Sequence, residues 1–170
     1  MIEARLYRAA FIPAALALVV AMFSLEAPPP ALPQGLAADV LFEGRSAQTT
    51  ATRLVEAHPD RRPGTRGNRA TAAAVGETLS GRGFQVAHDR FRAGGEDLVN
   101  VVARRPGASG RQIVVVAARD GDSVPDATRS GADTAALLEL GRVFGARASG
   151  ETLVLASVDG GTLGEAGARP

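Results

Sequence analysis

The sequence predicts an α/β fold: a three-layer domain with a mixed, largely parallel sheet, preceded by one N-terminal transmembrane helix. Short apolar runs rich in β-branched residues alternate with segments whose apolar positions recur at helical spacing. The last helical segment lies between two apolar runs, an order that can make a parallel strand pair. With 170 residues, 45% of them hydrophobic, the chain can bury one core.

The N-terminal region has the pattern of a membrane anchor. Residues 1–8 are expected to be a basic cytoplasmic segment, and residues 9–25 carry no charge. A helix of that length would span ~25 Å, near the lower limit for a ~30 Å hydrocarbon core. Glu26 is unsuited to a signal cleavage site, which favours an uncleaved anchor over a cleaved signal peptide. Arginines before the span predict a single-pass protein of the cell membrane with an extracytoplasmic C-terminal domain.

A proline-rich linker separates this segment from the folded part. Residues 26–38 contain four prolines, so they are expected to be extended, and the domain is expected over residues 39–170. The first predicted helix runs from Ser46, as its cap, to Ala57, before His58-Pro59. Asn68 is the predicted cap of a second, alanine-rich helix.

The remaining elements follow from apolar runs and their spacing. Three strands come next, two of them in a hairpin, and then one helix and a last buried strand. In order, these predicted elements cover Phe84–Phe91, Asp97–Ala103, Gln112–Ala117, Gly131–Arg147 and Glu151–Val158.

Composition excludes several classes of function. The chain has no cysteine, so disulfides and thiolate metal ligands are impossible. Nineteen basic residues face eighteen acidic ones, and few aromatic residues are present, which argues against nucleic-acid binding. The only histidines, His58 and His88, both precede the predicted strand ends where a cleft would form. The glycines around Gly160 match neither a dinucleotide-binding nor a P-loop spacing.

Three segments in order carry a resemblance to a known family: Arg62–Asn68, Leu98–Ala103 and Ser130–Leu140. Together they resemble the co-catalytic zinc aminopeptidases of metallopeptidase family 28, which include glutamate carboxypeptidase and glutaminyl-cyclase-like members. The resemblance covers roughly Ser46–Arg169, and the chain resembles a degenerate, C-terminally incomplete member.

The resemblance implies a zinc centre at the strand ends, but four of its positions differ here. Ala118 stands at the position of a zinc-binding histidine, and Ala127 at that of the aspartate that bridges the metals. Gly161 and Thr162 take the positions of the general base and the adjacent ligand. Asp120, which orients the histidine in the family, is kept. We therefore expect no catalytic residue, metal or other cofactor.

Charged residues near the strand ends keep other possibilities open. Asp126 could reach the metal position if its loop shifted. A calcium site among the acids from Asp120 to Asp133 would lack the glycine and glutamate of a calcium loop. A cleft that accepts a peptide terminus without cleaving it would be lined by Arg119, Asp120, Asp126 and Asp159.

The first functional hypothesis is an inactive, membrane-anchored, aminopeptidase-like domain that binds a peptide or membrane-protein partner as a binding or assembly module. The alternative is an active zinc-dependent aminopeptidase, with ligands in a longer frame or among Asp120, Asp126, Asp159 and Glu165. A third possibility is a fragment of a polytopic membrane protein.

Overall fold

The computed structural model describes residues 11, 13–20, 41–124, 129–145 and 149–169. The chain divides into two compact units, Met1–Leu36 and Ala37–Pro170, and the second contains the folded domain. In the first unit the described residues are helical. No helix among the described residues is long and apolar enough to cross a membrane. The rest of the predicted 9–25 span, and the 26–38 linker, lie outside the described residues.

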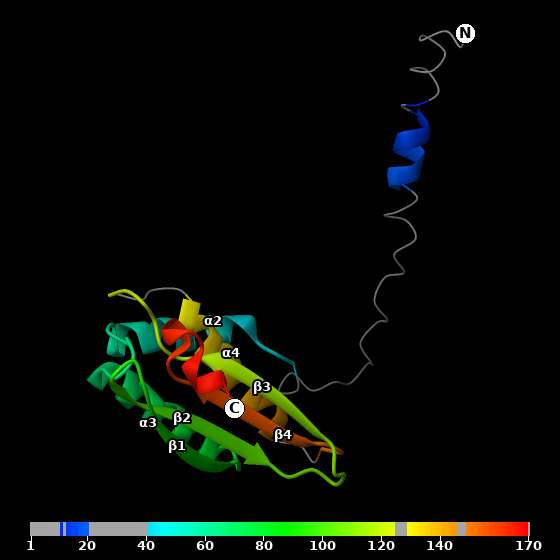
Figure 1. Ribbon diagram of the computed structural model, residues 1–170. Coiled ribbons are helices and arrows are strands. Elements are labelled where there is room, and N and C mark those ends of the chain that lie inside the picture. Colours follow the sequence, from blue (N-terminus) through cyan, green and yellow to red (C-terminus); the bar gives the residue numbers. More distant parts are fainter. Residues whose placement is uncertain (1–10, 12, 21–40, 125–128, 146–148, 170) are drawn as a thin grey trace. The chain divides into compact units, whose positions relative to one another are not determined.

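Helices and strands alternate in the second unit (Figure 1). Its helices are α2 (Gly44–Ala57), α3 (Arg66–Gly81) and α4 (Arg129–Gly145), followed by the 3-10 turns η2 (Gly161–Leu163) and η3 (Ala166–Ala168). Its strands are β1 (Gln85–Ala93), β2 (Glu96–Arg105), β3 (Gln112–Ala118) and β4 (Thr152–Val158).

The four strands form one mixed sheet in the order β1-β2-β4-β3. β3 and β4 are parallel and joined through α4, which confirms the expected crossover. β1 and β2 form a hairpin, whose turn uses Gly94 and Gly95 at positive φ. Because β2 also pairs antiparallel with β4, the prediction of a largely parallel sheet is wrong. The returning strand β4 inserts between β2 and β3, which local pattern does not reveal.

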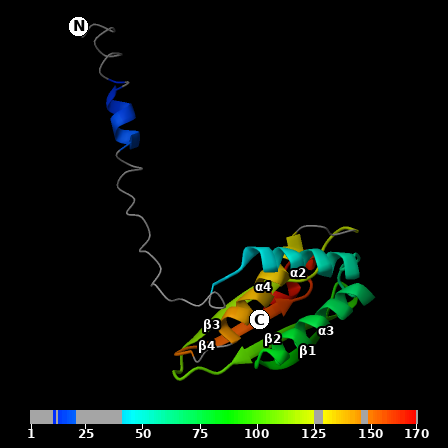
Figure 2. The ribbon, with the colours of Figure 1, turned by 180° about the vertical axis from the view of Figure 1, so that it is seen from behind.

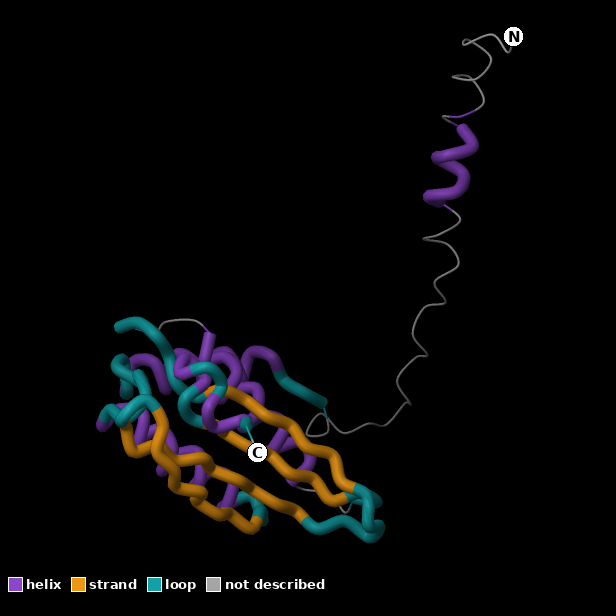
Figure 3. The backbone as a smooth tube through the Cα atoms, viewed as in Figure 1, coloured by secondary structure: helices purple, strands orange, loops and turns teal. Residues whose placement is uncertain are grey.

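The helices α2, α3 and α4 lie on one face of the sheet. The strands are in front in Figure 1, and the helices are in front in the opposite view of Figure 2; the tube in Figure 3 shows the same two layers. The predicted third layer is therefore absent from the described residues. The alternation of helices and strands suggested helices on both faces of the sheet. The two consecutive helices α2 and α3 and the crossover helix α4 can, however, all pack on the same face.

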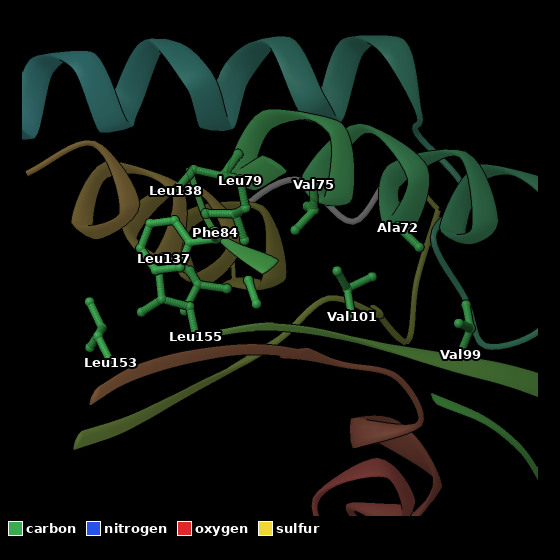
Figure 4. Close-up of a cluster of buried hydrophobic side chains, with 11 residues drawn as sticks. Ala72, Val75, Leu79, Phe84, Val99, Val101, Leu137, Leu138, Leu153 and Leu155 are labelled. Atoms are coloured by element: carbon green, nitrogen blue, oxygen red, sulfur yellow. The ribbon is translucent and has the colours of Figure 1, made fainter. Parts of the chain in front are cut away.

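The hydrophobic core lies between the sheet and the helices α3 and α4 (Figure 4). Leu79, Leu137 and Leu155 are at most 1% exposed. A Cβ atom at Gly141 would lie 2.5 Å from the Leu79 side chain, so a glycine lets α4 approach α3 closely. The core cluster consists of Ala72, Val75, Leu79, Phe84, Val99, Val101, Ala103, Leu137, Leu138, Leu153 and Leu155.

Two predicted helix caps are wrong. α2 begins at Gly44, two residues before Ser46, with Glu43 at the cap position. α3 is capped by Thr65, whose side chain accepts a hydrogen bond from the backbone N–H of Asn68. Asn68 itself lies in the first turn with its side chain fully buried. This frees the Asn68 amide for a long-range contact at the strand ends.

A carboxylate on α4 anchors the start of α2. Glu139, only 3% exposed, accepts a hydrogen bond from the backbone N–H of Glu43 at 2.9 Å. It also accepts from Nε and Nη2 of Arg142 at 3.0 and 2.6 Å. The hydrogen bonds from Arg142 lower the pKa of Glu139 below its ordinary value of 4.5, against the opposing effect of burial. The charged form of Glu139 therefore stabilises the fold.

We predict that Glu139→Gln lowers the free energy of unfolding by about 1–2 kcal/mol at neutral pH. A carboxyl whose folded pKa is depressed contributes stability above its unfolded pKa and loses it as the pH falls through the folded pKa. The wild-type chain should therefore lose more stability than the variant between pH 7 and about pH 3 in urea unfolding. Glu151→Gln is the matched control, and an unchanged pH dependence for Glu139→Gln would contradict the assignment.

Candidate functional site

The ends of β3 and β4 bring the expected site positions together. Ala118 pairs with Val158, so the segments that follow these residues leave the sheet side by side. A Cβ atom at Gly161 would lie 3.3 Å from the Ala118 Cβ and 3.2 Å from an Asp120 carboxylate oxygen. Three positions named by the resemblance therefore meet at one point, as an open α/β sheet would place them.

Asp120 lies on one side of this meeting point and binds the start of η2. Its carboxylate accepts hydrogen bonds from the backbone N–H groups of Gly161 and Thr162 at 2.8 and 2.9 Å. The Thr162 hydroxyl donates to the same carboxylate at 2.7 Å. Asp120 is 4% exposed, so these donors replace water. The carboxylate therefore fixes the start of η2, in the manner of a helix cap.

Arg119 lies on the opposite side of β3, toward the helices, because successive strand side chains alternate. It is fully buried. Its Nε donates to Asn68 Oδ1 at 2.6 Å, Nη1 donates to the Ser157 carbonyl at 3.0 Å, and Nη2 donates to the Val99 carbonyl at 2.6 Å. Burial lowers the pKa of Arg119, while Asp159 and Asp120 oppose that shift.

Asp159 is the counterion of Arg119. The two side chains are 0% and 2% exposed, and Nη2 lies 3.2 Å from Oδ2. The other carboxylate oxygen, Oδ1, accepts from Asn68 Nδ2 at 2.6 Å and from the Gly160 N–H at 2.9 Å. The Val99 N–H donates to Oδ2 at 3.3 Å. One buried network therefore joins α3, β2, β3 and β4.

The network continues into the C-terminal turns. The backbone N–H of Asp159 donates to Asn100 Oδ1 at 3.0 Å, and Asn100 Nδ2 donates to the Gly167 carbonyl at 2.9 Å. A Cβ atom at Gly167 would lie 2.6 Å from Asn100 Oδ1. No buried side-chain nitrogen or oxygen among the described residues lacks a hydrogen-bond partner. The polar interior at the strand ends is complete with protein groups alone.

The described residues do not fit a zinc ion. Ala118 and Gly161 have no ligating side chain, and the Thr162 hydroxyl donates to Asp120. The Asp159 carboxylate is held by Arg119 and three further donors. In the described part of the chain, no group of three or more His, Cys, Asp or Glu residues could hold a metal ion. Asp126 and Ala127 lie outside the described residues.

The prediction that Arg119 and Asp159 line an open cleft is wrong, because they are 0% and 1% exposed. Asp120 lies at the expected place but is bound to η2. Glu165 is an exposed residue with φ of 60°, between the two 3-10 turns.

Sequence reasoning missed Asn68, Asn100 and Ser157 as members of the network. Strand alternation offered a signal for Arg119, since it shares a strand face with Val115 and Ala117. An arginine at such a position must find buried acceptors.

Comparison with solved structures supports the sequence resemblance. A glutaminyl cyclase from Porphyromonas gingivalis aligns with 72% of the chain at 24% identity and a TM-score of 0.64. An Acidobacteriales bacterium glutaminyl cyclase aligns with 79% of the chain at 20% identity and a TM-score of 0.62. The chain shares their fold. A Zn-dependent exopeptidase from Parabacteroides distasonis aligns with 69% of the chain at 20% identity and a TM-score of 0.58.

The chain spans about half the length of these proteins, covering 46%, 48% and 47% of them respectively. No protein-family model and no curated protein matches the sequence. The expected resemblance to glutaminyl cyclases and zinc exopeptidases is confirmed at the level of fold.

We predict that Arg119→Ala lowers the free energy of unfolding by about 3–5 kcal/mol, because it leaves the Asp159 carboxylate buried and unpaired. Urea unfolding of the full chain measures the change. The matched control is Arg92→Ala, which breaks the exposed 2.9 Å pair with Asp97 and should change stability little. Equal effects of the two substitutions would contradict the role given to the buried pair.

Proposed function

We propose that this chain is a catalytically inactive, peptidase-like domain that acts as a binding or assembly module at a membrane. The carrying observation is the buried network of Arg119, Asp159 and Asn68 beside the capped η2 turn. This network fills the strand ends with side chains that use one another as hydrogen-bond donors and acceptors. A zinc hydrolase needs open ligands there and a base for the attacking water. Gly161 and Thr162 supply neither an imidazole nor a carboxylate.

A nearby pocket supports binding of a peptide terminus. β1 runs in the same direction as β4. The C-terminal end of β1 therefore lies at the same end of the sheet as the C-terminal ends of β3 and β4. The pocket has a volume of about 290 Å³ and is lined by Arg69 of α3, by Arg90, Phe91 and Arg92 of β1, and by Asp97, Leu98 and Val99 of β2.

Its charges favour an anion. Asp97 pairs with Arg92, and Arg69 donates to the Gly64 carbonyl. The Arg90 guanidinium forms no hydrogen bond or ion pair with another described residue. Arginine binds carboxylates through two parallel hydrogen bonds. A peptide whose C-terminal carboxylate lies beside an apolar side chain therefore suits this pocket.

We predict that the purified full chain holds no stoichiometric zinc and does not release amino acids from peptides, yet binds peptides that carry a free C-terminal carboxylate. Zinc is measured by mass spectrometry, turnover by chromatography and binding by calorimetry. The Parabacteroides distasonis exopeptidase is the positive control for zinc. Arg90→Ala should weaken peptide binding about tenfold, since it removes a charge-assisted hydrogen bond.

An exposed arginine away from the pocket provides the matched control. Arg104→Ala, on β2, should leave peptide binding unchanged. Tightly bound zinc with peptide cleavage would restore the alternative of an active zinc aminopeptidase. Equal binding of peptides with a free and with an amidated C-terminus would contradict the proposed carboxylate site.

Membrane anchoring belongs to the same proposal and rests on the uncharged segment 9–25 with arginines before it. We predict that the full chain stays with the membrane pellet after alkaline extraction and that protease reaches its domain only from the extracytoplasmic side. Replacing Leu16 and Leu18 by arginine should release it, since each charge costs about 2.5–3.5 kcal/mol at a helix centre. Leu41→Arg, an exposed position of the domain, is the control. Release of the wild-type chain would exclude a membrane anchor.

A further inference from the structure

The pocket beside the β1–β2 hairpin already contains one carboxylate. Among the described residues that line it, Asp97 is the only acid, beside Arg69, Arg90 and Arg92. Asp97 Oδ1 lies 2.9 Å from Arg92 Nε, and the Arg92 guanidinium also donates to the Gly95 carbonyl at 3.5 Å. The pocket therefore holds a carboxylate of its own on one of its three arginines.

The hairpin fixes the position of this ion pair. Asp97 is the direct cross-strand partner of Arg92, one step from the two-residue turn. Side chains of directly opposed residues lie on the same face of an antiparallel pair, with their Cβ atoms about 4.5–5.5 Å apart. Arg90 comes two residues before Arg92 on β1, so its side chain lies on that face too. The short turn therefore places the Asp97 carboxylate on the same face of the sheet as both guanidiniums of β1.

The charged side chains of the pocket favour a place that stays open to solvent. The side chains of Arg92 and Asp97 are 74% and 81% exposed. Burial of this pair beneath another part of the fold would remove the hydration of both charges, which their mutual attraction restores only in part. β1 is an outer strand of the sheet, and its charged side chains are typical of an edge strand that remains unpaired. A ligand can therefore reach the arginines.

The ion pair of Arg92 and Asp97 is weak enough for a ligand to open. An exposed pair of this kind changes an equilibrium constant by no more than about fivefold. A peptide carboxylate that reaches both Arg90 and Arg92 forms charge-assisted hydrogen bonds with two guanidiniums, whereas Asp97 bonds only one. We therefore expect a carboxylate held by Arg90 to replace Asp97 at Arg92.

We propose that Asp97 is an internal competitor of the peptide carboxylate and regulates how tightly the pocket binds it. In the free chain Asp97 occupies Arg92. When a peptide terminus binds Arg90, its carboxylate displaces Asp97 from Arg92, and the Asp97 side chain turns to solvent. The competition rests on the proposed peptide-binding function and adds to it a residue that lowers the affinity.

Calorimetry on the full chain in a mild detergent tests this competition, with a peptide that ends in leucine and a free carboxylate. Asp97→Asn keeps the size of the side chain and removes its charge, so peptide binding should tighten about fivefold as Arg92 becomes available. Asp89→Asn is the matched control. Asp89 is an exposed acid of β1 on the opposite face of the sheet, where it accepts a hydrogen bond from Asn100 at 3.4 Å. This control should change peptide binding less than about twofold.

A second background separates competition for Arg92 from simple charge repulsion. At about 0.15 M salt, the exposed charge of Asp97 alone should change peptide binding by about twofold or less. In an Arg92→Gln chain, Asp97→Asn should therefore tighten binding by no more than about twofold. An equal gain in both backgrounds, or no gain in the wild-type background, would overturn the competition but leave the carboxylate site in place if binding still depends on Arg90. A wild-type chain that binds no peptide would overturn the proposed binding function and the competition together.

Discussion

The buried ion pair between Arg119 and Asp159 is the interaction on which the strand ends depend. A guanidinium and a carboxylate removed from water are tolerated only when nearly every donor and acceptor is used. Here Asn68 bonds both side chains, and the backbone of Val99 meets each of them. The pair thereby fixes α3 against three strands of the sheet. The position of this ion pair explains why the C-terminal ends of the strands hold buried, hydrogen-bonded polar groups in place of an open cleft.

The side chains at the same end of the sheet are the basis of our proposal that the chain is catalytically inactive. Sheets of this kind place loops at one edge, and chemistry depends on the side chains that those loops present. In this chain Asp120 faces the N-terminus of η2 and neutralises its free N–H groups. The residues that follow β4 contribute backbone donors rather than ligands. The likeness to glutaminyl cyclases and zinc exopeptidases is therefore a likeness of scaffold.

Local patterns predicted most elements, because apolar spacing records which side of a helix or strand is buried. The parallel pair β3–β4 followed from the helix between two apolar runs. The order of the strands could not be predicted in this way, because β4 inserts beside β2 through tertiary contacts that local sequence patterns do not record. Asn68 was misassigned because Thr65, three residues earlier, also has a capping side chain and accepts a hydrogen bond from the Asn68 N–H. Ala118 and Gly161 could be located from sequence, whereas the ion pair that fills the site requires contacts 40 residues apart in the chain.

We infer that protein groups, rather than a metal, complete the strand ends. Urea unfolding of the full chain across a zinc titration tests it most directly, because a ligand that binds only the folded state raises the free energy of unfolding. Free zinc at 100 times its dissociation constant would add about 2.7 kcal/mol. We predict an unfolding midpoint that does not change from chelator to excess zinc. A midpoint that rises steadily with zinc concentration would contradict the account.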